Sequence, residues 1–141
     1  MRPEYFQLFE LVPHAQWSRT AHSTLWKLFD DRVLITLDAL RKRHGRMTMN
    51  DYHWGGHNEF RGWRPLDCAI GSTLSQHKFG RAADATFGDT GVEEVRQDIL
   101  ANKGKNDFSR YITRIEIGIP WLHFDVCNTD VNYVIQLPVP K

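Results

Sequence analysis

The sequence has few cysteines, no long apolar run and almost no net charge, and each shortage argues against a class of protein. Two cysteines among 141 residues, Cys68 and Cys127, cannot build a disulfide-rich scaffold. No window reaches the run of about 18 apolar residues that a membrane span needs. A formal net charge of +1 gives no general attraction to nucleic acid. We therefore expect no nucleic-acid partner and no membrane span.

The first residues also lack the features of a secretory signal. The stretch MRPEYFQLFELVPHAQW contains Glu4 and Glu10 and has no continuous apolar region. We expect the protein to be made in the cytoplasm without a signal peptide. Any substrate outside the cell would have to be reached by another route.

Length and composition indicate a folded protein of modest size. The hydrophobic share of 41% and the aromatic share of 12% are typical of a globular chain rather than a disordered one. A chain of 141 residues suits one domain with its own core better than two. We expect a single domain over residues 1–141 and a monomer.

The hydrophobic pattern predicts an α+β fold. Apolar residues three and four apart predict a helix over residues 24–44, with Ser23 as its N-cap and Gly45 at its end, and a second helix over residues 91–102. Short apolar or alternating runs predict strands at residues 47–52, 82–87, 111–118, 121–126 and 131–137. These elements predict helices packed on a small, mostly antiparallel sheet.

The stretch SQHKFGRAADATFGD raises the question of a metal site. It places His77 and Asp84 on either side of a turn marked by Gly80. A catalytic zinc site needs three protein ligands, usually imidazole or carboxylate groups, and one open position. The spacing alone is a weak signal for a ligand pair, and it favours an ordinary surface histidine and strand-end aspartate.

A third candidate ligand lies in the stretch WLHFDV. On a strand, alternation places its apolar residues against the core and Trp121, His123 and Asp125 on the opposite face. His123 could bind a metal there, and Asp125 could orient a ligand by hydrogen bonding. A solvent-exposed pair without a metal is the alternative. Cys127 follows on the same face, and we expect it to lie too far away to be a ligand.

The preceding strand offers a catalytic acid. A tight hairpin centred between Ile119 and Pro120 would place Glu116 opposite His123. A glutamate beside an activated water can take its proton and later return it to a leaving amine. The alternative is that Glu116 and Arg114 form a surface ion pair.

The histidines before this region form a separate pattern. His53 and His57 have the spacing of metal ligands on a helix, but the intervening Gly55 and Gly56 argue against a helix. We interpret this stretch as a rim or lid of a cleft, with Trp54 or Trp63 lining it.

Together these residues resemble a known family. The pattern S-x-H-x-x-G-x-A-x-D, which runs from Ser75 to Asp84, and the later W-L-H-F-D-V with His123 are similar to the zinc D-Ala-D-Ala carboxypeptidases. This family includes phage endolysin peptidases and D-Ala-D-Ala dipeptidases, and the hedgehog signalling domain shares its fold. The opening YFQLFELV and the helix before MTMNDY also resemble its phage and bacterial carboxypeptidase-like members.

The resemblance implies a fold, a cofactor and a substrate. It implies a hedgehog/DD-peptidase-like fold in which His77, Asp84 and His123 hold Zn²⁺. It further implies hydrolysis of a peptide bond in the stem peptides of bacterial peptidoglycan. The segment FRGWRP is similar to the family's S-G-Y-R segment, which makes Arg64 the counterpart of a substrate-binding arginine and Ser75 a neighbour on the same substrate.

The sequence departs from the family at one catalytic position. Many members carry an acid three residues before the last ligand, where this chain has Pro120. Glu116 is then the expected general base, acting from the adjoining strand. Asp125 is the alternative base, although its place two residues after His123 suits a supporting role better.

The expected function is therefore zinc-dependent cleavage of peptidoglycan peptides by a phage or prophage protein. Such a protein would reach the cell wall through phage lysis or as a virion component. Two other interpretations stay open: a non-catalytic zinc-containing binding module on the same fold, and a phage structural protein with a vestigial site. Carboxypeptidase and endopeptidase action are not separated by the sequence.

Overall fold

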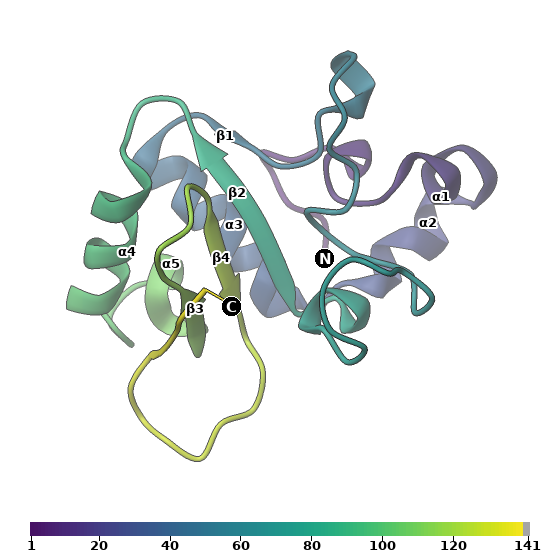
Figure 1. The fold of residues 1–141 in the computed structure, drawn as a ribbon. Coiled ribbons are helices and arrows are strands. Elements are labelled where there is room, and N and C mark those ends of the chain that lie inside the picture. The colour runs from purple at the N-terminus through teal and green to yellow at the C-terminus, as the bar shows by residue number, and fades with distance from the viewer. Residues whose placement is uncertain (140–141) are drawn as a thin grey trace.

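The computed structural model describes residues 1–139, and its helices lie behind and beside an open five-stranded sheet (Figure 1). Within that part, the α-helices and strands are α1 (His14–Arg19), α2 (His22–Leu25), α3 (Asp31–His44), β1 (Met47–Thr48), β2 (Ala82–Phe87), α4 (Val92–Ala101), α5 (Asp107–Arg110), β3 (Arg114–Glu116), β4 (Leu122–Asp125) and β5 (Ile135–Leu137). Short 3-10 helices are η1 (Leu8–Glu10), η2 (Trp26–Leu28), η3 (Tyr52–Trp54) and η4 (Gln76–Phe79). The α+β fold predicted from the sequence is confirmed.

The sheet has the strand order β1-β2-β4-β3-β5 and is mostly antiparallel. Only the edge pair of β3 and β5 is parallel. The longest strand, β2, pairs with β4 over residues 82–85, and this register places Asp84 directly opposite His123. The sheet thus brings together two candidate ligands that are far apart in the sequence.

One face of the sheet forms the core. Ala83 and Ala85 of β2 and Leu122 and Phe124 of β4 are almost completely buried in a single hydrophobic cluster. The α3 helix lies behind these strands, and α4 and α5 lie to its side (Figure 1). Because strand residues alternate between faces, the intervening Asp84, His123 and Asp125 lie on the opposite face. The face assignment predicted for WLHFDV is confirmed.

The helix predicted over residues 24–44 is interrupted. The α2 and η2 segments end at Leu28, Phe29 is extended, and α3 begins at Asp31. Asp30 is the N-cap of α3, because its Oδ1 accepts a hydrogen bond of 2.9 Å from the Arg32 amide. The prediction of Ser23 as N-cap is wrong, since Ser23 lies inside α2. The predicted end at Gly45 is correct, and Gly45 has a positive φ of 81°.

The strand predicted at residues 82–87 agrees with β2, and the other predicted strands are present but shorter than expected. The second helix agrees closely with α4, whereas β1 keeps only two residues of the strand predicted at 47–52. Within residues 1–139, no helix is long and apolar enough to cross a membrane.

Gly80 fixes the path between η4 and β2. It has a left-handed φ of 67°, and an added Cβ would overlap the Leu28 carbonyl oxygen. Its own carbonyl accepts a hydrogen bond of 3.0 Å from the Asp30 amide, the residue that caps α3. Gly80 therefore ties the loop that carries His77 to the start of the main helix.

We predict that Gly80→Ala destabilises the fold more than Gly104→Ala. Both glycines have positive φ, but nothing lies within 4 Å of a Cβ at Gly104. The control therefore carries the backbone cost of about 1–2 kcal/mol without a clash. The clash at Gly80 should add about 1–3 kcal/mol. Urea unfolding of both variants measures the difference, and equal free energies of unfolding would contradict the close approach to Leu28.

Candidate metal centre

His77 is positioned by a short turn of 3-10 helix. The Ser75 hydroxyl caps η4 by accepting a hydrogen bond of 3.3 Å from the His77 amide, and Gly80 ends the turn in the left-handed conformation. The His77 side chain is only 2% exposed. The loop that precedes β2 thus projects the imidazole toward the polar face of the sheet.

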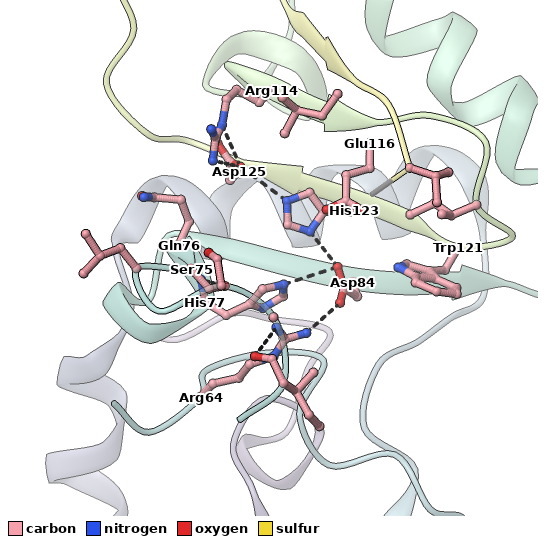
Figure 2. Close-up of a pocket in the computed structure, with 17 residues that line it drawn as sticks. Arg64, Ser75, Gln76, His77, Asp84, Arg114, Glu116, Trp121, His123 and Asp125 are labelled. Atoms are coloured by element: carbon pink, nitrogen blue, oxygen red, sulfur yellow. Dashed lines mark hydrogen bonds and ion pairs between the residues drawn. The ribbon is translucent and has the colours of Figure 1, made fainter. Parts of the chain in front are cut away.

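Three candidate ligands converge on one point. One donor atom from each of His77, Asp84 and His123 lies within 4.8 Å of the other two, and all three residues are buried. Figure 2 shows Asp84 between the two imidazole rings, with His77 from the loop and His123 from the neighbouring strand. The three residues predicted as ligands are therefore brought together in a geometry that could hold a metal ion.

A backbone contact fixes the ring of His77. Its Nδ1 lies 2.7 Å from the Gly62 carbonyl oxygen, which can only accept a hydrogen bond, so Nδ1 carries the proton. The Nε2 lone pair then faces Asp84, with 3.3 Å between Nε2 and Oδ1. This Nε2 is buried, and the contact lacks the alignment of a hydrogen bond. An unpartnered nitrogen lone pair facing a carboxylate is the arrangement of a metal ligand pair.

A pair of charged side chains fixes the ring of His123. Its Nε2 lies 3.3 Å from Asp125 Oδ2, while its Nδ1 lies 2.8 Å from Asp84 Oδ1. Asp125 is completely buried and accepts hydrogen bonds of 2.8 to 3.0 Å from the guanidinium of Arg114. Hydrogen bonding to Asp125 holds the ring so that Nδ1 points at Asp84.

Electrostatics keep these carboxylates ionised. Burial favours a raised pKa for Asp84, but the hydrogen bond with His123 and the nearby imidazoles outweigh burial and hold the pKa well below its ordinary value. Burial favours a lowered pKa for His123, but its hydrogen bonds to Asp125 and Asp84 prevail and raise the pKa to about 9. Despite burial, His123 and Arg114 together lower the pKa of Asp125 to about 2. In the metal-free protein, a proton on His123 thus neutralises part of this negative charge.

The donor set fits a zinc-like ion. Two imidazole nitrogens and one carboxylate oxygen form a ligand set typical of catalytic zinc, and it also tolerates other divalent metals. A bound cation would supply the unpartnered His77 Nε2 with a partner and replace the proton that His123 Nδ1 donates to Asp84. The residues present therefore fit a metal ion of this class.

Arg64 holds the third ligand from the other side. Its Nη2 donates to Asp84 Oδ2 over 3.2 Å, its Nε donates to the Phe60 carbonyl over 2.6 Å, and its Nη1 donates to the Ile70 carbonyl over 3.4 Å. The residue is 8% exposed. Arg64 thus binds one oxygen of Asp84 and leaves the other directed at the histidines (Figure 2).

The triad lies in a cleft with a volume of about 560 Å³, which is within the usual size of a ligand site. Arg64, Ser75, Glu116 and Asp125 all border this cleft. The pairs of Arg114 with Asp125 and of Ile115 with Phe124 confirm the predicted hairpin register, which puts Glu116 beside His123. Arg114 pairs with Asp125, so the alternative of an ion pair with Glu116 is not observed.

A buried arginine anchors the hairpin that carries Glu116. Arg96 of α4 is 3% exposed and donates from Nε to the Glu116 carbonyl over 3.1 Å. Its Nη2 donates to the carbonyls of Ile119 and Trp121, the latter over 2.8 Å. The position of Glu116 relative to the triad is thus fixed by α4 and by the sheet together.

Some site residues were not expected from the sequence. Arg114 and Trp121 both border the cleft. The alternation in WLHFDV correctly placed Trp121 on the same face as His123. That pattern could have predicted that Trp121 lines the cleft. The predicted rim tryptophan Trp54 instead projects into solvent, 62% exposed, and packs edge-on against Phe9. Cys127 is a free cysteine outside the group of ligand atoms.

Comparisons with protein families, with curated proteins and with solved structures find no match to this chain. Fold and site together define an α+β protein with a buried His–Asp–His group that could hold a metal ion. The argument about function therefore depends on the residues of this chain.

We predict that the purified protein binds about one zinc ion per chain. His77→Ala and His123→Ala should each reduce the bound zinc to background, because two ligands hold a metal poorly. Asp125→Asn should weaken zinc binding by about 10–100-fold, because it loosens the support of His123. Competition with a chromophoric chelator measures these affinities.

His53→Ala is the matched control for the histidine variants. His53 stacks on Phe9 with ring centroids 3.8 Å apart and lies outside the triad. Its zinc affinity should equal that of the unmodified protein. Retained zinc in His77→Ala or His123→Ala would show that the metal binds elsewhere.

Proposed function

We propose that this protein is a zinc metallopeptidase that hydrolyses a peptide bond in the stem peptides of bacterial peptidoglycan. The observation that carries the proposal is the convergence of His77, Asp84 and His123 in a cleft that also contains an acid and an arginine. The resemblance of the stretch from Ser75 to Asp84 to zinc carboxypeptidases and endolysin peptidases supports the choice of zinc and of peptidoglycan.

The triad residues would hold the cofactor, His77 through Nε2, His123 through Nδ1 and Asp84 through Oδ1. When bound, zinc supplies Lewis-acid chemistry, which acidifies water and polarises a carbonyl group. Arg64 keeps Asp84 oriented, and Arg114 with Asp125 keeps His123 oriented. These contacts hold the ligands in place before the substrate arrives, which avoids reorganisation during the reaction.

Glu116 is the proposed general base. It is half-buried on β3, borders the cleft and lies beside His123 in the register of the hairpin. Its carboxylate would take a proton from water and give it to the departing amine. Asp125 is less suited to this role, because both of its oxygens are engaged by Arg114 and Oδ2 also faces His123.

Ser75 and Arg64 stay proposed substrate contacts. Both border the cleft, although the Ser75 hydroxyl also caps η4 and Arg64 is engaged by three acceptors. Pro120 in place of the usual family acid favours one other candidate function, a non-catalytic zinc module that binds a ligand in the same cleft.

We predict that Glu116→Gln abolishes hydrolysis while leaving zinc bound. Loss of a general base lowers the rate by about 10²–10⁴-fold. The assay is release of new amino groups from purified peptidoglycan, with and without a chelator, and with zinc content measured on the same samples. Glu94→Gln, at an exposed position on α4, is the matched control and should keep full activity.

The two candidate functions give different results in this assay. Chelator-sensitive hydrolysis in the unmodified protein supports the peptidase. Bound zinc without any hydrolysis supports the binding module. Full activity in Glu116→Gln would remove Glu116 as the base without removing the peptidase function.

A further inference from the structure

A second recess adjoins the metal cleft on the far side of Asp84. It has a volume of about 190 Å³ and shares Arg64, Ile70, Asp84 and Trp121 with the main cleft. Figure 2 shows Trp121 beside Asp84 on the side away from Ser75. The two hollows therefore meet at these shared residues, and a substrate that occupied both would pass Asp84.

Among the arginines that line this recess, Arg61 has an unengaged guanidinium. Its amide donates to Asn50, but among residues 1–139 no hydrogen bond or ion pair engages its side chain. Its guanidinium carbon lies 5.9 Å from the centroid of the Trp121 ring, which is at the outer limit of a cation–π contact. Arg61 is half-buried at the recess wall and has all five N–H groups available.

The other arginines near the triad are already engaged. Arg64 donates to Asp84 and to two backbone carbonyls, and Arg114 donates from Nε and Nη2 to Asp125. Their charges are balanced by these carboxylates. A substrate carboxylate gains most from a guanidinium whose paired donors are free, because a bidentate contact needs two parallel N–H groups.

The acids near Arg61 form no ion pair with its guanidinium among residues 1–139, so the guanidinium can still bind a substrate carboxylate. Asp51 is within range of its charge but is held by the amide and side chain of Asn58. Glu59 also borders the recess, and its charge acts on Tyr52, whose pKa is raised to about 12 by burial and by this neighbour. The recess thus offers both a cation and an acceptor, which suits a peptide with a carboxylate and N–H groups.

We propose that Arg61, with Trp121 beside it, is the residue that binds a substrate carboxylate next to the scissile bond. This inference rests on the proposed peptidase function and assigns the anion contact to Arg61 instead of Arg64. Arg64 then acts as a positioning residue for Asp84. The carboxylate is either the chain terminus of a stem peptide or the α-carboxylate of its D-glutamate.

The test measures binding of three synthetic peptides to the zinc-loaded protein by calorimetry. They are L-Ala-γ-D-Glu-L-Lys-D-Ala-D-Ala, in which the γ-linked D-glutamate keeps a free α-carboxylate, its C-terminal amide, and the form in which that α-carboxylate is an amide. We expect one amide to bind about 10–100-fold more weakly than the parent peptide, since a charge-assisted hydrogen bond is lost. A weakened terminal amide identifies the chain terminus as the ligand, and a weakened internal amide identifies the D-glutamate.

The variants assign that loss to Arg61. Arg61→Gln should bind the parent peptide as weakly as the unmodified protein binds the amide whose affinity falls. Arg61→Gln should bind that amide with the same low affinity, because the lost contact is the same. Arg61→Lys keeps the positive charge but lacks the paired N–H groups of a guanidinium. Its affinity for the parent peptide should lie between those of the unmodified protein and Arg61→Gln. Arg110→Gln, an exposed arginine on α5, is the control and should bind like the unmodified protein.

The outcomes separate this inference from the proposed function. Binding with the expected pattern but without hydrolysis, monitored by mass spectrometry, keeps the Arg61 site and removes the peptidase. The Arg61 site is overturned if the unmodified protein binds the three peptides with equal affinity or binds none of them. It is also overturned if Arg61→Gln loses the same affinity for all three peptides. A loss of the carboxylate preference in Arg64→Gln with zinc retained, and not in Arg61→Gln, returns the role to Arg64.

Discussion

The site depends on the buried carboxylate of Asp84 and on how its charge is compensated. Moving an ionised carboxylate out of water costs several kcal/mol unless opposite charges and hydrogen bonds surround it. Asp84 is 7% exposed and is contacted by His77, His123 and Arg64. This arrangement leaves two histidine nitrogens and one carboxylate oxygen directed at a common point. A bound divalent cation would satisfy all three atoms at once.

The fold supplies that compensation from several separate elements. The pairing of β2 with β4 brings His123 opposite Asp84, and the turn ended by Gly80 brings His77 to the same face. The hydrophobic face of the same strands packs on α3, so Asp84 and His123 are carried on strands that are part of the buried core. The surrounding loops supply Arg64 and Arg61, whereas α4 anchors the hairpin of Glu116 through Arg96.

Much of this site could be predicted from local sequence patterns. Alternation in WLHFDV correctly placed His123 and Asp125 on the polar face, and the hairpin register correctly placed Glu116 beside His123. The direct pairing of β2 with β4 could not be predicted, because strand order depends on packing between distant segments. The hydrogen bond between Arg64 and Asp84 could not be predicted for the same reason. The interruption of the long helix at Asp30 was not predicted because a local N-cap competes there with a continuous apolar pattern.

The most direct test of the central claim is X-ray absorption spectroscopy of the zinc-loaded protein. The account predicts a first coordination shell of nitrogen and oxygen atoms at about 2.0–2.2 Å, with imidazole scattering from two histidines. That scattering should be lost in His123→Ala, whose bound zinc should fall to background. A sulfur neighbour at about 2.3 Å would place the metal at a cysteine instead and contradict the His77–Asp84–His123 site.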